Sequence, residues 1–152
     1  MANTLPLAAG KPGIADALGN AIAFFATVFT NAGAAIITNR ITQLGTASKN
    51  IGWGTGVTGS AVTQTALVTE AAPTAAGGRT IGSESRTTVT NANDNYQVTG
   101  TVTAAGSLAI TEAGLFDAVS AGNMLIRADF APVNVVAGDS IALTFGLKFI
   151  PG

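Results

Sequence analysis

The sequence contains no cysteine and no histidine. Without cysteine, the chain can form neither a disulfide framework nor a thiolate metal site. Without histidine, Ser-His-Asp and Cys-His catalysis and imidazole metal ligation are excluded. General acid–base chemistry would therefore depend on the carboxylates, which are Asp16, Glu70, Glu84, Asp94, Glu112, Asp117, Asp129 and Asp139.

Charged and aromatic side chains are also scarce, at 10% and 6% of the residues, whereas 47% are hydrophobic. An ordinary soluble domain has about 25% charged residues. A surface this poor in charge favours burial against copies of the same chain or against a partner, with a threonine-rich β surface as the alternative. Nucleic acid is not an expected partner, because the basic residues are spread singly: Lys11, Arg40, Lys49, Arg79, Arg86, Arg127 and Lys148.

A membrane span is not expected either. The apolar run at residues 14–29 is interrupted by Asp16 and Asn20, and it is short for a hydrocarbon layer of about 30 Å. A signal peptide is also not expected, because residues 1–11 precede any apolar run and Asp16 lies inside it. With 152 residues, the chain predicts a single domain.

The first thirty residues differ from the rest. Residues 1–13, with prolines and glycines but no periodicity, predict an extended arm. Residues 14–29 have apolar side chains at a spacing of about 3.6, which predicts a helix that packs on the domain's own sheet or between subunits. The candidate contacts with another subunit or a capsid are Leu5, Leu7, Ile14, Leu18, Ile22, Phe24, Phe25, Val28 and Phe29.

Alternating apolar residues predict strands in the second half of the chain. The clearest is residues 141–149, where large apolar side chains alternate with small or polar ones. Residues 124–130 predict a second half-buried strand, and residues 96–103 a third. Turns are expected at residues 120–123 and 137–139, with Pro132 between the two last strands.

The segment from residue 30 to residue 90 is less regular. Thr30 or Asn31 can cap a short helix that ends before Gly45, although residues 35–41 also suit a strand. Glycines alternate at positions 52, 54 and 56 around Trp53; no Gly-Lys-Ser/Thr follows, so a strand and a wide turn with positive φ are favoured over a phosphate loop. Residues 66–68 suggest a short strand or turn, and residues 80–90 an edge strand.

Seven to nine strands are therefore expected after residue 35. The predicted fold is mainly β, an antiparallel sandwich or jelly-roll-like domain with an N-terminal extended arm and one or two short helices. We assign residues 1–30 to the arm and apolar helix, and residues 31–152 to the β-sandwich domain.

Among the carboxylates, only Glu112 and Asp117 lie together in an apolar stretch. A glycosidase pair is one interpretation, but a spacing of five in a strand places the two on opposite faces. We expect Glu112 to accept hydrogen bonds from the backbone or an arginine where the strand bends at Gly114, and Asp117 to start the turn toward Gly122. Asp94 lacks the further carboxylates that a calcium loop needs. No catalytic, cofactor or metal site is expected, and the chain is not expected to be an enzyme.

The stretch ITEAGLFDA at residues 110–118, followed by GNML at residues 122–125, resembles small virion structural proteins of tailed bacteriophages. These are head decoration (cement), head-fibre or tail-fibre-like modules. Supporting segments are TNAG at 30–33, IGWGTG at 51–56, ALVTE at 66–70 and YQV at 96–98. The resemblance implies a β-sandwich that acts by binding, with structural roles for the motif residues Trp53, Glu112, Gly114, Leu115, Phe116 and Asp117.

The function implied by this resemblance is decoration of the capsid exterior. The chain would be made in the host cytoplasm and would bind the major capsid protein as a homo-oligomer, a trimer before a dimer. Residues 1–30 would reach a neighbour or the shell. The alternatives are a tail-fibre or collar attachment module and a carbohydrate-binding sandwich, for which Trp53 and Tyr96 are the only polar-tipped aromatic residues.

Overall fold

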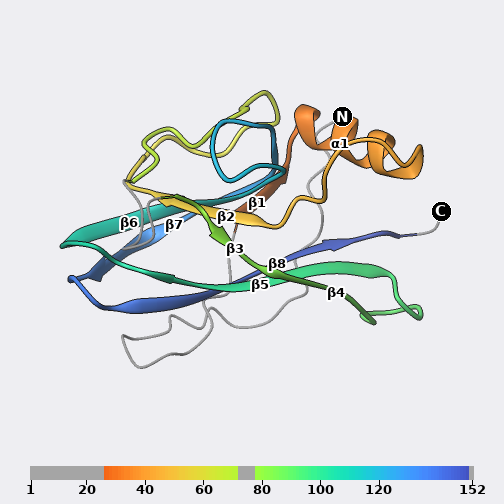
Figure 1. Cartoon of the computed structure of the whole chain (residues 1–152). Coiled ribbons are helices and arrows are strands. Elements are labelled where there is room, and N and C mark those ends of the chain that lie inside the picture. The colour runs from red at the N-terminus through yellow and green to blue at the C-terminus, as the bar shows by residue number, and fades with distance from the viewer. Residues whose placement is uncertain (1–25, 72–77, 151–152) are drawn as a thin grey trace.

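Two antiparallel sheets face each other in the computed structural model, which describes residues 26–71 and 78–150. The first sheet has five strands in the order β1-β7-β6-β2-β3, and the second has three in the order β4-β5-β8. Figure 1 shows them as two layers, with the helix α1 at one end. This arrangement confirms the prediction of a mainly β, sandwich-like fold.

Each sheet includes strands that lie far apart in the chain. The five-stranded sheet consists of β1 (Ala26–Phe29), β7 (Met124–Val135), β6 (Leu108–Phe116), β2 (Asn50–Gly54) and β3 (Thr80–Ile81). The three-stranded sheet consists of β4 (Ser83–Thr87), β5 (Asn95–Thr103) and β8 (Ser140–Lys148). Helix α1 (Asn31–Ile41) follows β1 directly.

The main core lies between the two sheets. Side chains of one parity along β5 and β8 are buried there, as alternation in a half-buried strand requires. They meet residues such as Ile51, Trp53 and Leu115 of the five-stranded sheet. The predicted burial is confirmed for Ile141, Leu143, Phe145 and Leu147. It is wrong for Phe149, which lies beyond the end of β8 and is 50% exposed.

Strand β7 differs from the prediction in two ways. It was expected to be half-buried, but Leu125 and Arg127 are as buried as the residues on its other face. Arg127 is buried because residues 55–71 cover the outer face of the sheet (Figure 1), whereas Leu125 belongs to the main core together with Ile36 of α1. Pro132 does not separate β7 from β8 but lies inside β7, where the pairing with β6 is interrupted between Ile110 and Glu112. A proline is tolerated at such a break because no ladder hydrogen bond is lost there.

The prediction of a helix over residues 14–29 is wrong at its C-terminal end. Val28 and Phe29 lie in β1, where they pair with Arg127 and Ile126 of β7. β1 therefore belongs to the five-stranded sheet. The other candidate contact residues of this segment lie outside the described residues: Leu5, Leu7, Ile14, Leu18, Ile22, Phe24 and Phe25.

The short helix predicted after residue 30 is confirmed, and the strand alternative is excluded. Thr30 is the N-cap: its hydroxyl accepts a hydrogen bond from the N–H of Gly33 at 2.9 Å and donates to the carbonyl of Met124. A side chain at Gly33 would lie 2.6 Å from the carbonyl oxygen of Leu125, so this glycine lets α1 approach β7 closely. The helix ends at Ile41, before Gly45 with its φ of 70°.

The connections show where local sequence signals were adequate. The turns at residues 120–123 and 137–139 are confirmed, with positive φ at Ala121, Gly122 and Gly138. Residues 66–68 form a turn without a strand, and residues 88–90 lie beyond β4 rather than in it. The predicted edge position is confirmed, because β3 and β4 are edge strands of their sheets.

Candidate functional site

A buried ion pair lies on the outer side of the five-stranded sheet. Oε2 of Glu112 on β6 lies 2.8 Å from Nη2 and 3.0 Å from Nε of Arg127 on β7. Both side chains have 0% exposure. The register explains the contact, because Arg127 pairs with Gly114, two residues along β6 on the same face as Glu112.

The Glu112 carboxylate also holds the segment at residues 55–71, which we call the cover loop. Its Oε1 accepts hydrogen bonds from the N–H groups of Gly56 at 3.0 Å and Thr69 at 2.7 Å. Its Oε2 accepts one from the N–H of Val68 at 3.0 Å. Together with Arg127, these bonds engage both oxygens of the carboxylate. We conclude that Glu112 acts as a fixed acceptor that anchors the cover loop.

These bonds lower the pKa of Glu112. Burial by itself raises the pKa, but the N–H groups of Thr69 and Val68 and the Arg127 guanidinium outweigh it, so the pKa lies below its ordinary value. A carboxylate held in this way remains ionised at neutral pH. It does not have the raised pKa of a general acid, and no oxygen of it faces solvent.

Arg127 and Asp129 hold residues 58–64 of the cover loop through hydrogen bonds. Nη1 of Arg127 donates to Oε1 of Gln64 at 2.8 Å, and its Nη2 donates to the carbonyl of Thr58 at 2.7 Å. Asp129, next along the same face of β7, accepts from the N–H of Ser60 at 2.9 Å and from its hydroxyl. The loop is therefore fixed through polar groups, while Leu67 packs with Phe116 and Met124 in a small apolar cluster.

Three alternating glycines make room for this arrangement. Gly52, Gly54 and Gly56 do not have positive φ, so the reason predicted from the sequence is wrong. A side chain at Gly54 would lie 2.6 Å from Oε1 of Glu112, and one at Gly56 would lie 2.6 Å from Cβ of Val68. The glycines are needed because the cover loop and the Glu112 carboxylate occupy the space of their missing side chains.

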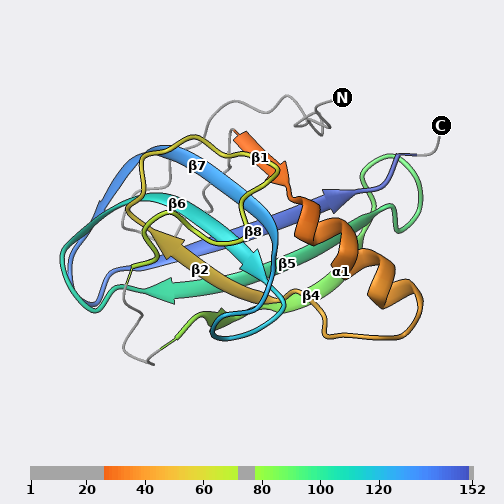
Figure 2. The same cartoon turned by 90° about the horizontal axis from the view of Figure 1, so that it is seen from above.

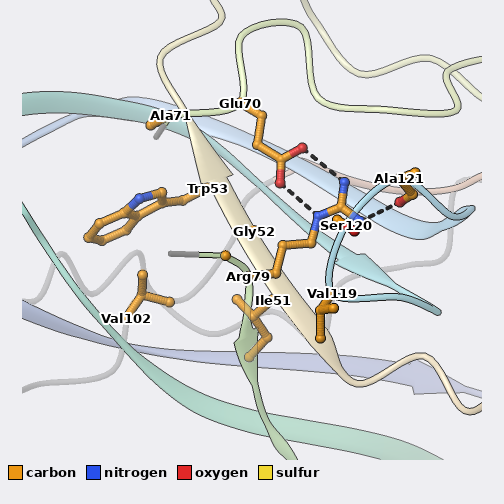
Figure 3. A pocket seen from close by; sticks show the side chains of 11 residues that line it. Ile51, Gly52, Trp53, Glu70, Ala71, Arg79, Val102, Val119, Ser120 and Ala121 are labelled. Atoms are coloured by element: carbon orange, nitrogen blue, oxygen red, sulfur yellow. Dashed lines mark hydrogen bonds and ion pairs between the residues drawn. The ribbon is translucent and has the colours of Figure 1, made fainter. Parts of the chain in front are cut away.

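A second polar cluster lies beside Trp53, around Arg79 (Figure 3). Nε and Nη2 of Arg79 donate to the two oxygens of Glu70 at 2.7 and 2.9 Å, which is a bidentate pair. Its Nη1 donates to the carbonyls of Ala118 at 3.0 Å and Ala121 at 2.6 Å. Its guanidinium carbon lies 3.3 Å from the centre of the Phe116 ring. Arg79 therefore joins the end of the cover loop to the turn after β6.

These residues border a cavity of about 230 Å³. Figure 3 shows the Trp53 ring and Val102 on one side of β2, and Glu70 with Arg79 and the turn at Val119–Ala121 on the other. Trp53 is 2% exposed, so it is a core residue and offers no surface for stacking a sugar ring. The donors of Arg79 that contact Glu70, Ala118 and Ala121 are already committed to the fold.

The remaining carboxylates singled out from the sequence cap turns. Asp117 accepts from the N–H of Asn123 at 2.7 Å, which confirms that it starts the turn toward Gly122. It does not share a partner with Glu112. Asp94 accepts from the N–H groups of residues 89–91 at 2.7 to 2.9 Å. Hydrogen bonds from the backbone, that of Asn91 first, lower the pKa of Asp94 below its ordinary value.

The other motif residues are structural. Leu115 is fully buried in the main core, and Phe116 is fully buried beneath Arg79. Gly114 is paired with Gly52 and Arg127, and the register irregularities of β6 with β7 lie on either side of it, at Ile110/Glu112 and Leu115/Phe116. A side chain at Gly114 would lie 3.0 Å from Sδ of Met124, so the glycine serves the packing of the small apolar cluster.

Sequence reasoning foresaw the kind of partner that Glu112 has, but it missed Arg127 and Arg79. The signal for Arg127 was a single arginine between large apolar residues in a strand, which is a position for a paired charge. No comparable signal existed for Arg79, because its partners come from the cover loop and from the turn after β6.

Comparison with models of protein families, with curated proteins and with solved structures found no match to this chain. In residues 26–71 and 78–150, no three His, Cys, Asp or Glu side chains are grouped in a way that would hold a metal ion. The helix in this part of the chain is too short and too polar to cross a membrane.

Proposed function

We propose that this chain is a non-enzymatic structural protein of a virion that binds the outside of a phage capsid as a homo-oligomeric decoration or cement protein. Its partners would be copies of itself and the major capsid protein. The resemblance of residues 110–125 to such proteins motivates the proposal.

The observation that carries the proposal is the apolar character of the surface. Large hydrophobic side chains are strongly exposed on several elements, including Ile41 at 77%, Val57 at 88% and Ile81 at 63%. Only 10% of the residues are charged, so few long charged side chains are available to cover this surface. Such a surface favours association with other protein surfaces.

The buried charges support the same role. Glu112 and Arg127 are used entirely to fix the cover loop, and Arg79 to fix the turn after β6. Because these charged side chains hold the loop and the turn in place, the protein presents a rigid surface, which suits a role in binding. It gives no support to a carbohydrate-binding role through Trp53, which lies in the core.

The first test is the copy number of this chain per virion, measured by quantitative mass spectrometry against the major capsid protein. We expect a ratio near one or a simple fraction of it, as a protein that covers the shell requires. A few to a few dozen copies would favour the alternative, a tail-fibre or collar module. Undetectable copies would contradict a role in the virion altogether.

A second test concerns the N-terminal segment. We propose that residues 1–25 reach a neighbouring subunit or the shell. The deletion should stop at residue 25, because Ala26–Phe29 pair with β7 and their loss would damage the sheet. We expect the shortened protein to fold, as judged by circular dichroism, and to lose particle binding. Retention of particle binding by the shortened protein would refute this role.

A further inference from the structure

A groove opens between α1 and the end of the three-stranded sheet. It has a volume of about 360 Å³ and lies at the end of the sandwich where α1 and the C-terminal end of β8 meet (Figures 1 and 2). Its walls are mostly apolar and come from both layers of the fold: Ile36, Ile37 and Ile41 of α1, Leu125 of β7, Tyr96 of β5 and Phe149 after β8.

Several strongly exposed apolar side chains lie at or next to this groove. Ile41 is 77% exposed and Phe149 is 50% exposed, and both line the groove. Leu44 and Ile150, which follow them closely in the chain, are 63% and 57% exposed. Exposed apolar side chains gathered around a groove are typical of a surface that another protein covers.

Two opposite charges stand on opposite walls of the groove. Arg40 belongs to α1 and Glu84 to β4, and both are exposed. Nη1 of Arg40 donates to the carbonyl of Gly45 at 3.0 Å, and Oε2 of Glu84 accepts from the Tyr96 hydroxyl at 3.3 Å. Among the ion pairs of the described residues, neither Arg40 nor Glu84 takes part.

We propose that a second copy of this chain docks at this groove, with Arg40 of each copy paired with Glu84 of the other. A two-fold contact brings the same patch of both copies together, so each residue pair occurs twice. A patch with one positive wall, one negative wall and an apolar mouth is complementary to itself under such a rotation. A partner whose surface carries a single sign of charge would be repelled by one of the two walls.

This inference rests on the self-association proposed above and specifies its surface. It makes a two-fold dimer the unit formed in solution, instead of the trimer expected from the family resemblance. Attachment to a capsid is a separate property, because a chain that pairs through this groove keeps its other exposed surfaces, such as those of Val57 and Ile81, available.

The test uses two charge reversals, Arg40→Glu and Glu84→Arg, in the full-length chain. Each variant alone places like charges opposite each other twice per dimer, so we expect at least a roughly tenfold weaker dimer. Mass is measured by light scattering after size exclusion, and circular dichroism verifies that each variant is folded. The wild-type chain is expected to be a dimer whose affinity falls with added salt.

Mixing the two variants supplies the decisive comparison. In a mixed dimer, both cross-copy pairs are attractive, so we expect the mixture to regain the dimer that each variant has lost. A role of Arg40 and Glu84 within one chain predicts no recovery, because each chain keeps its own like charges. If the mixture does not regain the dimer, or if each variant alone has the same mass as the wild-type chain, this groove is not the dimer contact. Neither outcome bears on capsid binding, which the copy number per virion tests separately.

The apolar part of the contact has its own matched pair of variants. Ile41→Gln should weaken the dimer about tenfold or more, because Ile41 lies at the mouth of the groove. Val136→Gln is the control, since Val136 is 56% exposed in the connection from β7 to β8, at the opposite end of the sandwich in Figure 1. Equal effects of the two substitutions, or none from Ile41→Gln, would contradict the proposed surface.

Discussion

The carboxylate of Glu112 lies 2.8 Å from Nη2 of Arg127, and neither side chain is exposed to solvent. Removing a charged side chain from water costs several kcal/mol, and both members of this pair carry that cost. The cost is offset here because the cover loop supplies further partners. Gly56, Val68 and Thr69 donate to the carboxylate, and Thr58 and Gln64 accept from the guanidinium.

The first prediction concerns removal of one member of this pair. Arg127→Met should lower the free energy of unfolding by about 3–5 kcal/mol, because it leaves the Glu112 charge buried without a counter-ion. The double variant Glu112→Gln/Arg127→Met should be more stable than the sum of the two single effects predicts, since it removes both charges. Urea denaturation of the four proteins measures this coupling.

The control for that cycle is the more exposed pair of Glu70 with Arg79, in which Glu70 is 36% exposed. Glu70→Gln should cost less than Arg127→Met, because the Glu70 carboxylate is partly screened by solvent and Arg79 keeps its bonds to the carbonyls of Ala118 and Ala121. Additive effects of the two substitutions in the buried pair would show that the charges do not depend on each other.

The second prediction concerns acid. Because the folded-state pKa of Glu112 lies below its ordinary value of 4.5, its contribution to stability is complete above pH 4.5 and is lost as the pH falls through the lower folded value. Asp94, whose pKa is also lowered, acts in the same direction below its ordinary value of 3.8. The urea midpoint should therefore fall steeply below about pH 4.5, and Glu112→Gln should flatten that fall. Parallel pH profiles for the two proteins would contradict the assignment.

How much of the fold the sequence predicts depends on what covers each face. β5 and β8 were predicted correctly because one face of each packs in the core and the other meets solvent, which produces clean alternation. β7 carries the same alternation in part, but the cover loop buries its second face. No periodicity in residues 55–71 signals that they lie over a sheet, so the burial of Arg127 was not foreseen.

The candidate site was predicted in kind but not in detail. The expectation that Glu112 accepts backbone or arginine hydrogen bonds is confirmed. The identity of the arginine depends on the register of β6 and β7, which sequence alone does not fix across a bulge. The glycines around Trp53 were explained by backbone conformation, whereas their cause is the close approach of the cover loop. Such an approach involves residues far apart in the chain, so local sequence rules do not encode it.

The third prediction tests that close approach. Gly54→Ala should destabilise the protein by about 1–3 kcal/mol, because the new methyl group would lie 2.6 Å from Oε1 of Glu112 and force the cover loop outward. Limited proteolysis should then cut the loop faster than in the wild-type protein. Gly59→Ala in the same loop is the control, since no atom lies within 4 Å of its added carbon. Equal stability of the two variants would refute the steric explanation.

The fourth prediction concerns the shape of the Arg79 side chain rather than its charge. Arg79→Lys keeps the positive charge but loses the bidentate contact with Glu70 and the stacking on Phe116. We expect a loss of about 1.5–3 kcal/mol in the free energy of unfolding, the range of hydrogen bonds to charged groups. Acrylamide should also quench Trp53 more strongly, because that side chain borders the same cavity.

Arg86→Lys is the matched control for this substitution, since Arg86 is an exposed residue of β4. It should change the stability by less than about 0.5 kcal/mol, as surface substitutions usually do. The quenching of Trp53 should stay at its wild-type level, because Arg86 does not line the cavity. If Arg79→Lys behaves like Arg86→Lys in both measurements, a point charge at position 79 is sufficient. The planar guanidinium would then not be what joins the cover loop to the turn after β6.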